Sequence, residues 1–355
     1  MGRLIVWGGL VLVLALVLTA VVKVVAGGDS VWHVSERAPL PPVPVALPDD
    51  GSWPAWKAGM EALAAGGADA GALRELLSSS EGAPDPDRVA AIAPPPEALA
   101  AMPDPLATRG LRVPLTALDA PSELPREAMA APYAWLLRAW EQNEDPDAAE
   151  ADLLRALQFG VVMQHSGESL VANMLGIHAQ RRALSEAEEM VAAGLPAASL
   201  DRLATAVEAS RALGPGVGAG IRGDCTMIAD GFETLLDQAQ TPGTKPLPGP
   251  AVGYSPNRTV SFLLHQCRVA LANVDRPPEE RQPIPPSPPL SGLGYVDNPV
   301  GRILLRVGSV PSVRFLESVD RLGEERAAFL DLVAQAPPDG GKEPSTGGAP
   351  DSSTR

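Results

Sequence analysis

The most constraining feature of this 355-residue chain is an apolar segment at its amino end. Residues 4–26 contain a single charged side chain, that of Lys23. As an α-helix this segment would be about 34 Å long, enough to cross the roughly 30 Å hydrocarbon core of a bilayer. The rest of the chain is proline-rich and acidic. The sequence therefore predicts one membrane-spanning helix that carries a separate body.

A cleaved secretory signal peptide is the alternative interpretation of this segment. Arg3 supplies the usual positive start, and residues 24–26 offer small side chains for cleavage. Signal-peptide apolar cores usually have about 7–15 residues, so the longer run favours an uncleaved anchor. Both interpretations export the body. Arg3 on one flank, set against Lys23 and Arg37 on the other, favours an amino terminus that stays inside.

Charge and composition restrict the classes of partner. The formal net charge is −15, and residues 40–150 hold eighteen acidic against seven basic side chains. Nucleic-acid-binding proteins need clustered basic surfaces, so we expect no nucleic-acid partner. The abundance of Ala, Gly, Pro and Arg is typical of a GC-rich bacterial genome. We therefore expect a bacterial inner-membrane protein with its body in the periplasm.

The chain divides by composition into four parts. Residues 1–28 are the predicted anchor or signal sequence, and residues 29–50 form a predicted proline-rich stalk. Residues 51–335 carry helical patterns, whereas the Gly-, Ser- and Pro-rich residues 336–355 are predicted to be a disordered tail.

Apolar residues in the body recur at helical spacing, and no β-alternation of useful length competes. Before the clearest stripe, Asp145 and Pro146 have the character of an N-cap and a first helical residue, which explains the acidic stretch there better than a calcium loop does. The glycine-rich residues 214–220 are expected to be a flexible connection. No tetratricopeptide period is present, so the predicted fold class is all-α, an irregular multi-helix bundle with proline-rich loops.

Two cysteines, Cys225 and Cys267, lie on separate predicted helices. In an exported chain an even pair is a candidate disulfide, and this one would close a loop of 42 residues. Two independent buried thiols are the alternative. Without clustered histidines, a zinc site is not expected.

His165 and Glu168 are the first candidate site. They lie three residues apart and extend an apolar stripe, so an uninterrupted helix would turn both side chains inward. A carboxylate beside an imidazole can orient a base or bind a metal. The alternative is a structural pair, or a solvated turn at Gly167.

Three arginines at or near predicted helix starts form the second candidate group, namely Arg222, Arg258 and Arg302. A fourth arginine, Arg181, interrupts the apolar stripe of a predicted helix. Internal ion pairs are the expected role, and a small anion-binding cleft is the alternative, although Asp224 offers Arg222 a nearby countercharge.

Asn298 and Arg302 belong to a short segment that we expect to dock the last helix onto the core. Asn298 can cap a helix that begins at Pro299, and Arg302 can reach an acid on a neighbouring helix.

The order of several short motifs resembles a group of uncharacterised bacterial single-pass membrane proteins. These motifs are Asp-Pro-Leu at 104–106, Asn-Arg-Thr at 257–259 and Asn-Pro-Val-Gly-Arg-Ile-Leu at 298–304, and the resemblance covers most of residues 50–330. That group has no assigned activity. The resemblance implies an anchor and an extracytoplasmic helical domain, and it transfers no catalytic residue.

No phosphate-binding loop, dinucleotide fingerprint or HExxH motif occurs, and we predict no cofactor. The expected function is that of a membrane-anchored envelope protein that binds or scaffolds a protein partner. The alternative is an enzyme or metal-binding bundle that uses His165 and Glu168.

Overall fold

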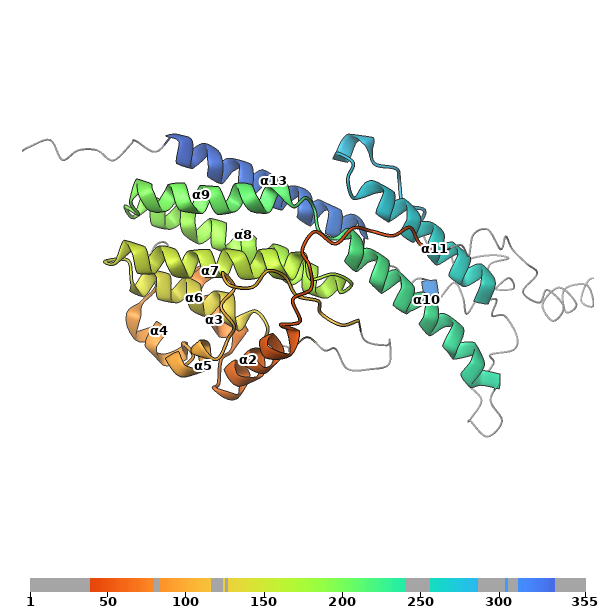
Figure 1. The fold of residues 1–355 in the computed structure, drawn as a ribbon, viewed down its shortest axis with the longest axis horizontal. Coiled ribbons are helices and arrows are strands. Elements are labelled where there is room, and N and C mark those ends of the chain that lie inside the picture. The colour runs from red at the N-terminus through yellow and green to blue at the C-terminus, as the bar shows by residue number, and fades with distance from the viewer. Residues whose placement is uncertain are drawn as a thin grey trace, which may run out of the picture.

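The computed structural model describes residues 39–79, 83–115, 124, 127–240, 256–286, 304–305 and 312–335. Within these ranges the chain forms eleven α-helices, one short 3-10 helix and no strand (Figure 1). The predicted all-α class is therefore confirmed. The helices are α2 (Trp53–Ala65), α3 (Ala70–Ser79), α4 (Pro86–Ile92), α5 (Pro96–Ala100), α6 (Ala130–Glu141), α7 (Pro146–Gln164), α8 (Leu170–Ala192), α9 (Ala197–Ala212), α10 (Gly218–Gln240), α11 (Pro256–Asn273), η2 (Pro278–Glu280) and α13 (Ser312–Gln335).

The centre of the body is the pair α7 and α8, which make the most extensive helix contact. Helices α6, α9 and α13 pack around this pair, and the short helices α2 to α5 cover α6 at one side (Figure 1). Helices α10 and α11 pair with each other, and α10 also packs against α8. The body is thus a central bundle with a two-helix arm.

Apolar side chains at helical spacing explain how α2 joins this bundle. Trp56 is fully buried, with its ring centroid 5.4 Å from that of Phe159 on α7. Trp135 of α6 lies 6.2 Å from the same ring. Large aromatic side chains bury much apolar surface, so these three rings fix α2 and α6 against α7.

The acidic stretch before α7 begins the helix as predicted. The Asp145 side chain accepts a hydrogen bond from the Ala148 N–H, and Pro146 is the first helical residue. Glu150, by contrast, is buried and forms an ion pair with Arg202 of α9. The stretch therefore both caps α7 and attaches α9.

The predicted stalk, residues 29–50, requires a correction, because its latter part lies along the body (Figure 1). A Cβ atom on Gly218 would lie 2.8 Å from Cγ1 of Val43, so this valine packs directly on the start of α10. Further along, the Asp50 N–H donates to the Gly110 carbonyl at 3.2 Å. This part of the segment is docked and does not form a free stalk.

The flexible connection expected at residues 214–220 is also corrected. Helix α10 already begins at Gly218, and a Cβ atom on Gly220 would lie 1.9 Å from Oδ1 of Asn173. The glycines thus permit a close helix crossing. Similarly, the proline-rich loop after α11 is tied back, because Arg281 donates to both Asp320 oxygens at 2.5 and 2.6 Å.

None of the helices in the described part of the chain combines the length and apolar character that a membrane crossing requires. The predicted anchor at residues 4–26 and the predicted tail at residues 336–355 lie outside the described residues.

Candidate functional site

The structure does not bring His165 and Glu168 together. Helix α7 ends at Gln164, and Gly167 turns the chain with a φ of 91°, so the uninterrupted helix that the pair requires is absent and the alternative, a turn at Gly167, is present. The His165 side chain is buried, with its ring against Gly216, whereas Glu168 is partly exposed and pairs with Arg112 at 2.9 Å. The two side chains therefore cannot act as one acid–base pair.

His165 borders a buried polar network at the end of α7. The Gln164 Oε1 atom accepts from the Gln180 side chain at 2.6 Å and from Arg326 of α13 at 3.3 Å. The Gln164 Nε2 atom donates to the Pro215 carbonyl at 2.7 Å. A single amide thus links α7, α8, α13 and the loop before α10.

Burial makes the charges of this network costly. Loss of water lowers the pKa of Arg326 to about 10, and Arg211 adds to this effect. Burial also lowers the pKa of His165 to about 4, with a further contribution from Arg326. Neither ring nitrogen of His165 has a hydrogen-bond partner among the residues that the structure describes. The imidazole is consequently neutral at pH 7, and the network positions helices instead of exchanging protons with solvent.

A surface pocket of about 320 Å³ lies between α8 and α13 and gathers a set of polar side chains of both charges. We call it the α8–α13 pocket. It is lined by His178, Arg181, Arg182, Leu184, Ser185 and Glu188 from α8 and by Glu325 from α13.

Helical spacing explains this lining, because residues three, four and seven apart share one face of α8. The imidazole of His178 forms a hydrogen bond with Tyr133 of α6, whose hydroxyl lies 2.8 Å from Nε2. Partial burial lowers the pKa of His178, and the nearby cations Arg181, Arg74 and Arg182 lower it further. His178 is therefore a neutral polar group at pH 7.

Both arginines of the pocket form ion pairs within the body. Arg181 donates to both oxygens of Glu325 at 2.7 to 2.9 Å, which confirms the expectation of an ion pair for this arginine. Arg182 pairs with Glu186, which also accepts from the Trp140 indole at 2.6 Å. Both arginines are thus neutralised by a carboxylate from the body itself.

Glu188 has no ion pair with a side chain of the described ranges. Partial burial raises its pKa, and the nearby carboxylates Glu325 and Glu189 raise it further. The pocket therefore holds one carboxylate whose charge is not compensated.

Of the remaining predicted arginines, only Arg222 has a side chain that the structure describes. Arg222 lies within α10, its Nε is buried without a partner, and the described residues give it no ion pair. Asp224, the expected countercharge, instead accepts a hydrogen bond from the Leu170 N–H at the start of α8. The side chain of Arg258 and the whole of Asn298 and Arg302 lie outside what the structure describes.

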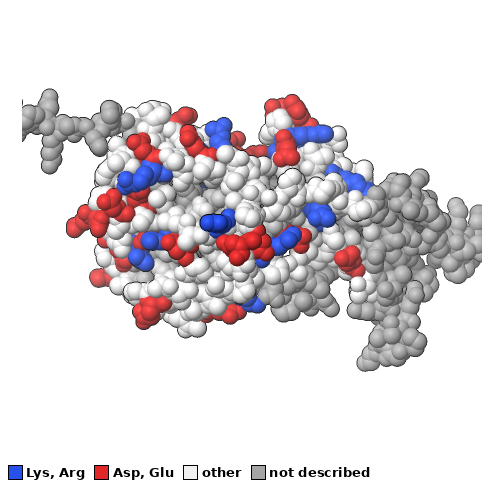
Figure 2. All heavy atoms as spheres, in the orientation of Figure 1, with Lys and Arg blue, Asp and Glu red and all other residues white. Residues whose placement is uncertain are grey.

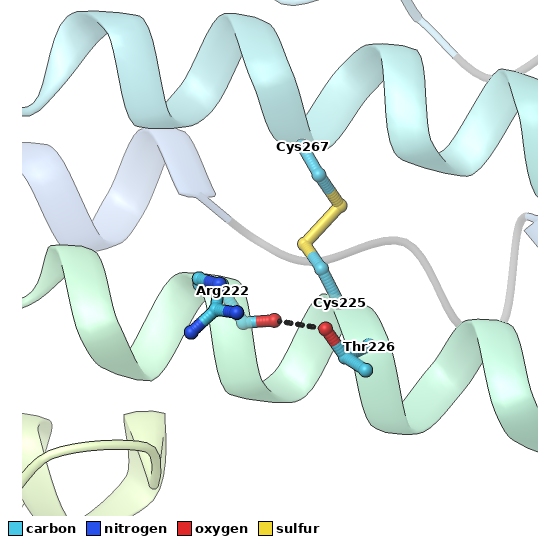
Figure 3. The surroundings of a disulfide bond; sticks show 4 residues. All are labelled: Arg222, Cys225, Thr226 and Cys267. Atoms are coloured by element: carbon cyan, nitrogen blue, oxygen red, sulfur yellow. Dashed lines mark hydrogen bonds between the residues drawn. A yellow bond between two sulfur atoms is a disulfide. The ribbon is translucent and has the colours of Figure 1, made fainter. Parts of the chain in front are cut away.

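Cys225 and Cys267 are joined by a disulfide between α10 and α11, with a Cα–Cα distance of 6.3 Å (Figure 3). Both sulfur-bearing residues are buried. Thr226, next to Cys225, donates its hydroxyl to the Arg222 carbonyl at 2.9 Å. The bond fastens the two helices of the arm to each other.

A second pocket, of about 440 Å³, lies where the docked amino-terminal segment meets the loop before α10 and the end of α11. Its walls are mostly apolar and proline-rich, with Arg268 and Asp275 at the α11 side. Among the described residues no group of three His, Cys, Asp or Glu side chains is placed to hold a metal ion.

Sequence reasoning missed the α8–α13 pocket. The signal was a polar face on α8 from His178 to Glu188, but such a face is more often simply solvated. Glu325 lies 144 residues from Arg181 and could not be paired with it from spacing.

Comparisons with family models, curated proteins and solved structures find no match. The resemblance seen in the sequence stays a prediction, and the geometry of this chain alone supports a functional argument.

Proposed function

We propose that this chain is a single-pass protein of the bacterial inner membrane whose helical body lies in the periplasm and binds a protein partner. The disulfide between Cys225 and Cys267 is the observation that carries the location, because such bonds persist in oxidising compartments outside the cytoplasm. The apolar run at residues 4–26 supports an anchor of sufficient length.

The docked amino-terminal segment limits how far the body can stand from the membrane. Contacts to the body begin within residues 39–50, so only residues 27–38 separate them from the proposed anchor. Even when fully extended, twelve residues span roughly 40 Å. The proposed arrangement therefore keeps the arm of α10 and α11, on which the segment lies, near the bilayer surface.

A binding role fits the surface better than catalysis does. Acidic and basic side chains alternate over the face shown in Figure 2, with no continuous basic area there. The α8–α13 pocket offers fixed charges, whereas His165 and Glu168 point to different surroundings. No observation favours the enzyme or metal-binding alternative built on that pair.

Membrane fractionation combined with thiol labelling tests this proposal. We expect the full-length chain to stay in the pellet after alkaline carbonate extraction, and protease added to spheroplasts to digest the body. We also expect the denatured, unreduced protein to take up no thiol label until a reductant is added.

Release of full-length protein by carbonate would contradict the anchor, and protection of the body from protease would contradict the periplasmic location. Uptake of two label equivalents without a reductant would remove the observation on which the location depends.

A further inference from the structure

Not every charged side chain in the α8–α13 pocket has a partner of opposite charge among the described residues. Arg181 is held by two oxygens of Glu325, and Arg182 is held by the buried carboxylate of Glu186. Glu188 remains without a cation among the described side chains. The lining itself holds two arginines and two glutamates, and Glu188 is left without a partner because Glu186, which lies outside the lining, takes up Arg182.

The other lining residues leave room for a basic side chain. Leu184 is only 2% exposed and so offers little apolar contact, and the stem of a lysine or arginine would lie beside it while the charged end reaches a polar group. Ser185 adds a hydroxyl, and the neutral His178 adds no positive charge that would repel a cation. The pocket volume of about 320 Å³ lies at the lower end of the range of ligand sites.

We propose that the α8–α13 pocket binds the lysine or arginine side chain of a partner protein, with Glu188 as the carboxylate that accepts it. This inference rests on the proposed function as a protein-binding module. The net charge of −15 on the chain favours approach of a basic partner before the pocket is reached.

An anionic ligand would face an obstacle in the same pocket. It would have to displace Glu325 from a bidentate pair with Arg181, or Glu186 from Arg182 and the Trp140 indole. Displacement of Glu325 would break a two-oxygen pair that is only partly exposed, and displacement of the buried Glu186 would also cost its hydrogen bond with the Trp140 indole, which is unfavourable. A cation requires no such exchange, because Glu188 has no ion pair with any described side chain.

Titration of the full-length protein in neutral detergent tests the inference. The probe is Nα-acetyl-lysinamide at pH 7.5, and the uncharged Nα-acetyl-norleucinamide has a stem of similar length. Binding is followed through the ring signals of the four histidines, with the His178 signal identified by its loss in His178→Gln. We expect saturable, millimolar binding of the lysine probe that shifts the His178 signal.

Two charge-matched variants decide whether Glu188 is the acceptor. Glu188→Gln should weaken the lysine probe at least fivefold, whereas Glu208→Gln, an exposed carboxylate on α9, should change its affinity less than twofold. Both variants leave the histidine signals of the unliganded fold available as a check on structure.

Equal binding of the norleucine probe, equal weakening by the two variants, or preferential binding of Nα-acetyl-glutamate would overturn the inference. These outcomes are independent of the fractionation assays, because the titration uses purified protein. The pocket assignment and the proposed location can therefore fail separately.

Discussion

The two helix pairs α7–α8 and α10–α11 are joined by opposite means. In the first pair the backbones almost touch, since a Cβ atom on Gly176 would lie 2.1 Å from the Gln164 nitrogen and 2.5 Å from the Gly160 carbonyl oxygen. In the second pair a disulfide links Cys225 and Cys267, whose Cα atoms lie 6.3 Å apart.

The surroundings of each pair account for this difference. Helices α7 and α8 lie at the centre, and contacts with α6, α9 and α13 add to their own close packing. The α10–α11 pair touches the bundle chiefly through α10 and α8. A peripheral pair buries less shared surface, so a covalent link contributes relatively more to it.

Removal of the disulfide should have the largest effect. Closure of a 42-residue loop corresponds to about 3–4 kcal/mol in the free energy of unfolding by the chain-entropy relation. We expect Cys225→Ala combined with Cys267→Ala to lose this amount in denaturant unfolding. Hydrogen exchange should show lost protection in α10 and α11 and retained protection in α7 and α8.

Uniform loss of protection across all four helices would contradict this comparison, because it would mean that the arm and the bundle unfold as one unit. The wild-type protein treated with a reductant is the control, and it should behave as the double variant does.

Gly176→Ala should destabilise the centre by about 2–3 kcal/mol. The added methyl group would meet backbone atoms of α7, which cannot move aside as a flexible side chain can. Gly323→Ala in α13 is the matched control, because nothing lies within 4 Å of its Cβ position and alanine favours a helix. A thermal shift of the same sign for both variants would show that close packing at Gly176 is unimportant.

Sequence patterns predicted the helices of the bundle because apolar periodicity and caps are local features. They also predicted the cysteine pairing, since the chain has only two. At His165 the apolar pattern alone could not decide between a continuing helix and a turn at Gly167, and the positive φ of Gly167 shows that the turn is present. Glycines at 214–220 could equally mark flexibility or close approach, and only the position of Asn173 distinguishes the two.

The α8–α13 pocket lay beyond prediction for a different reason. An ion pair in this pocket joins Arg181 to Glu325. The next residue, the buried Arg326, donates a hydrogen bond to the Gln180 side chain. Tertiary pairing over such separations depends on how α13 packs, and that packing has no local signature. The sequence indicated which residues were unusual without indicating their partners.

Acid should weaken the junction between the two helix pairs through His165. Its pKa is about 4 when folded and 6.5 when unfolded, so only the unfolded chain takes up a proton between these values. Stability is therefore full above pH 6.5 and falls as the pH approaches 4. From pH 7.5 to 5 this residue should cost about 2 kcal/mol in the free energy of unfolding.

Asp224 of α10 acts in the opposite direction. Burial raises its pKa to about 6, so its contribution is complete below the ordinary value of 3.8 and is lost as the pH rises through 6. We expect His165→Gln to reduce the loss of stability on acidification and Asp224→Asn to increase it. Unfolding curves at pH 7.5 and 5 check both, and identical pH dependence in the two variants would contradict the assignment.

The smallest expected effect comes from a substitution in α10 that changes the helix propensity of α10 and leaves its disulfide intact. Thr226 is exposed, and its hydroxyl bonds back to the Arg222 carbonyl one turn earlier (Figure 3). Alanine is a better helix former than threonine, so Thr226→Ala should stabilise the oxidised protein by about 0.5 kcal/mol. In the reduced protein, where α10 unfolds more readily, the same change should slow amide exchange in α10 and leave α8 unaffected. Equal slowing in α8 would show that the arm has no independent opening, and that the contrast between the two helix pairs does not extend to their dynamics.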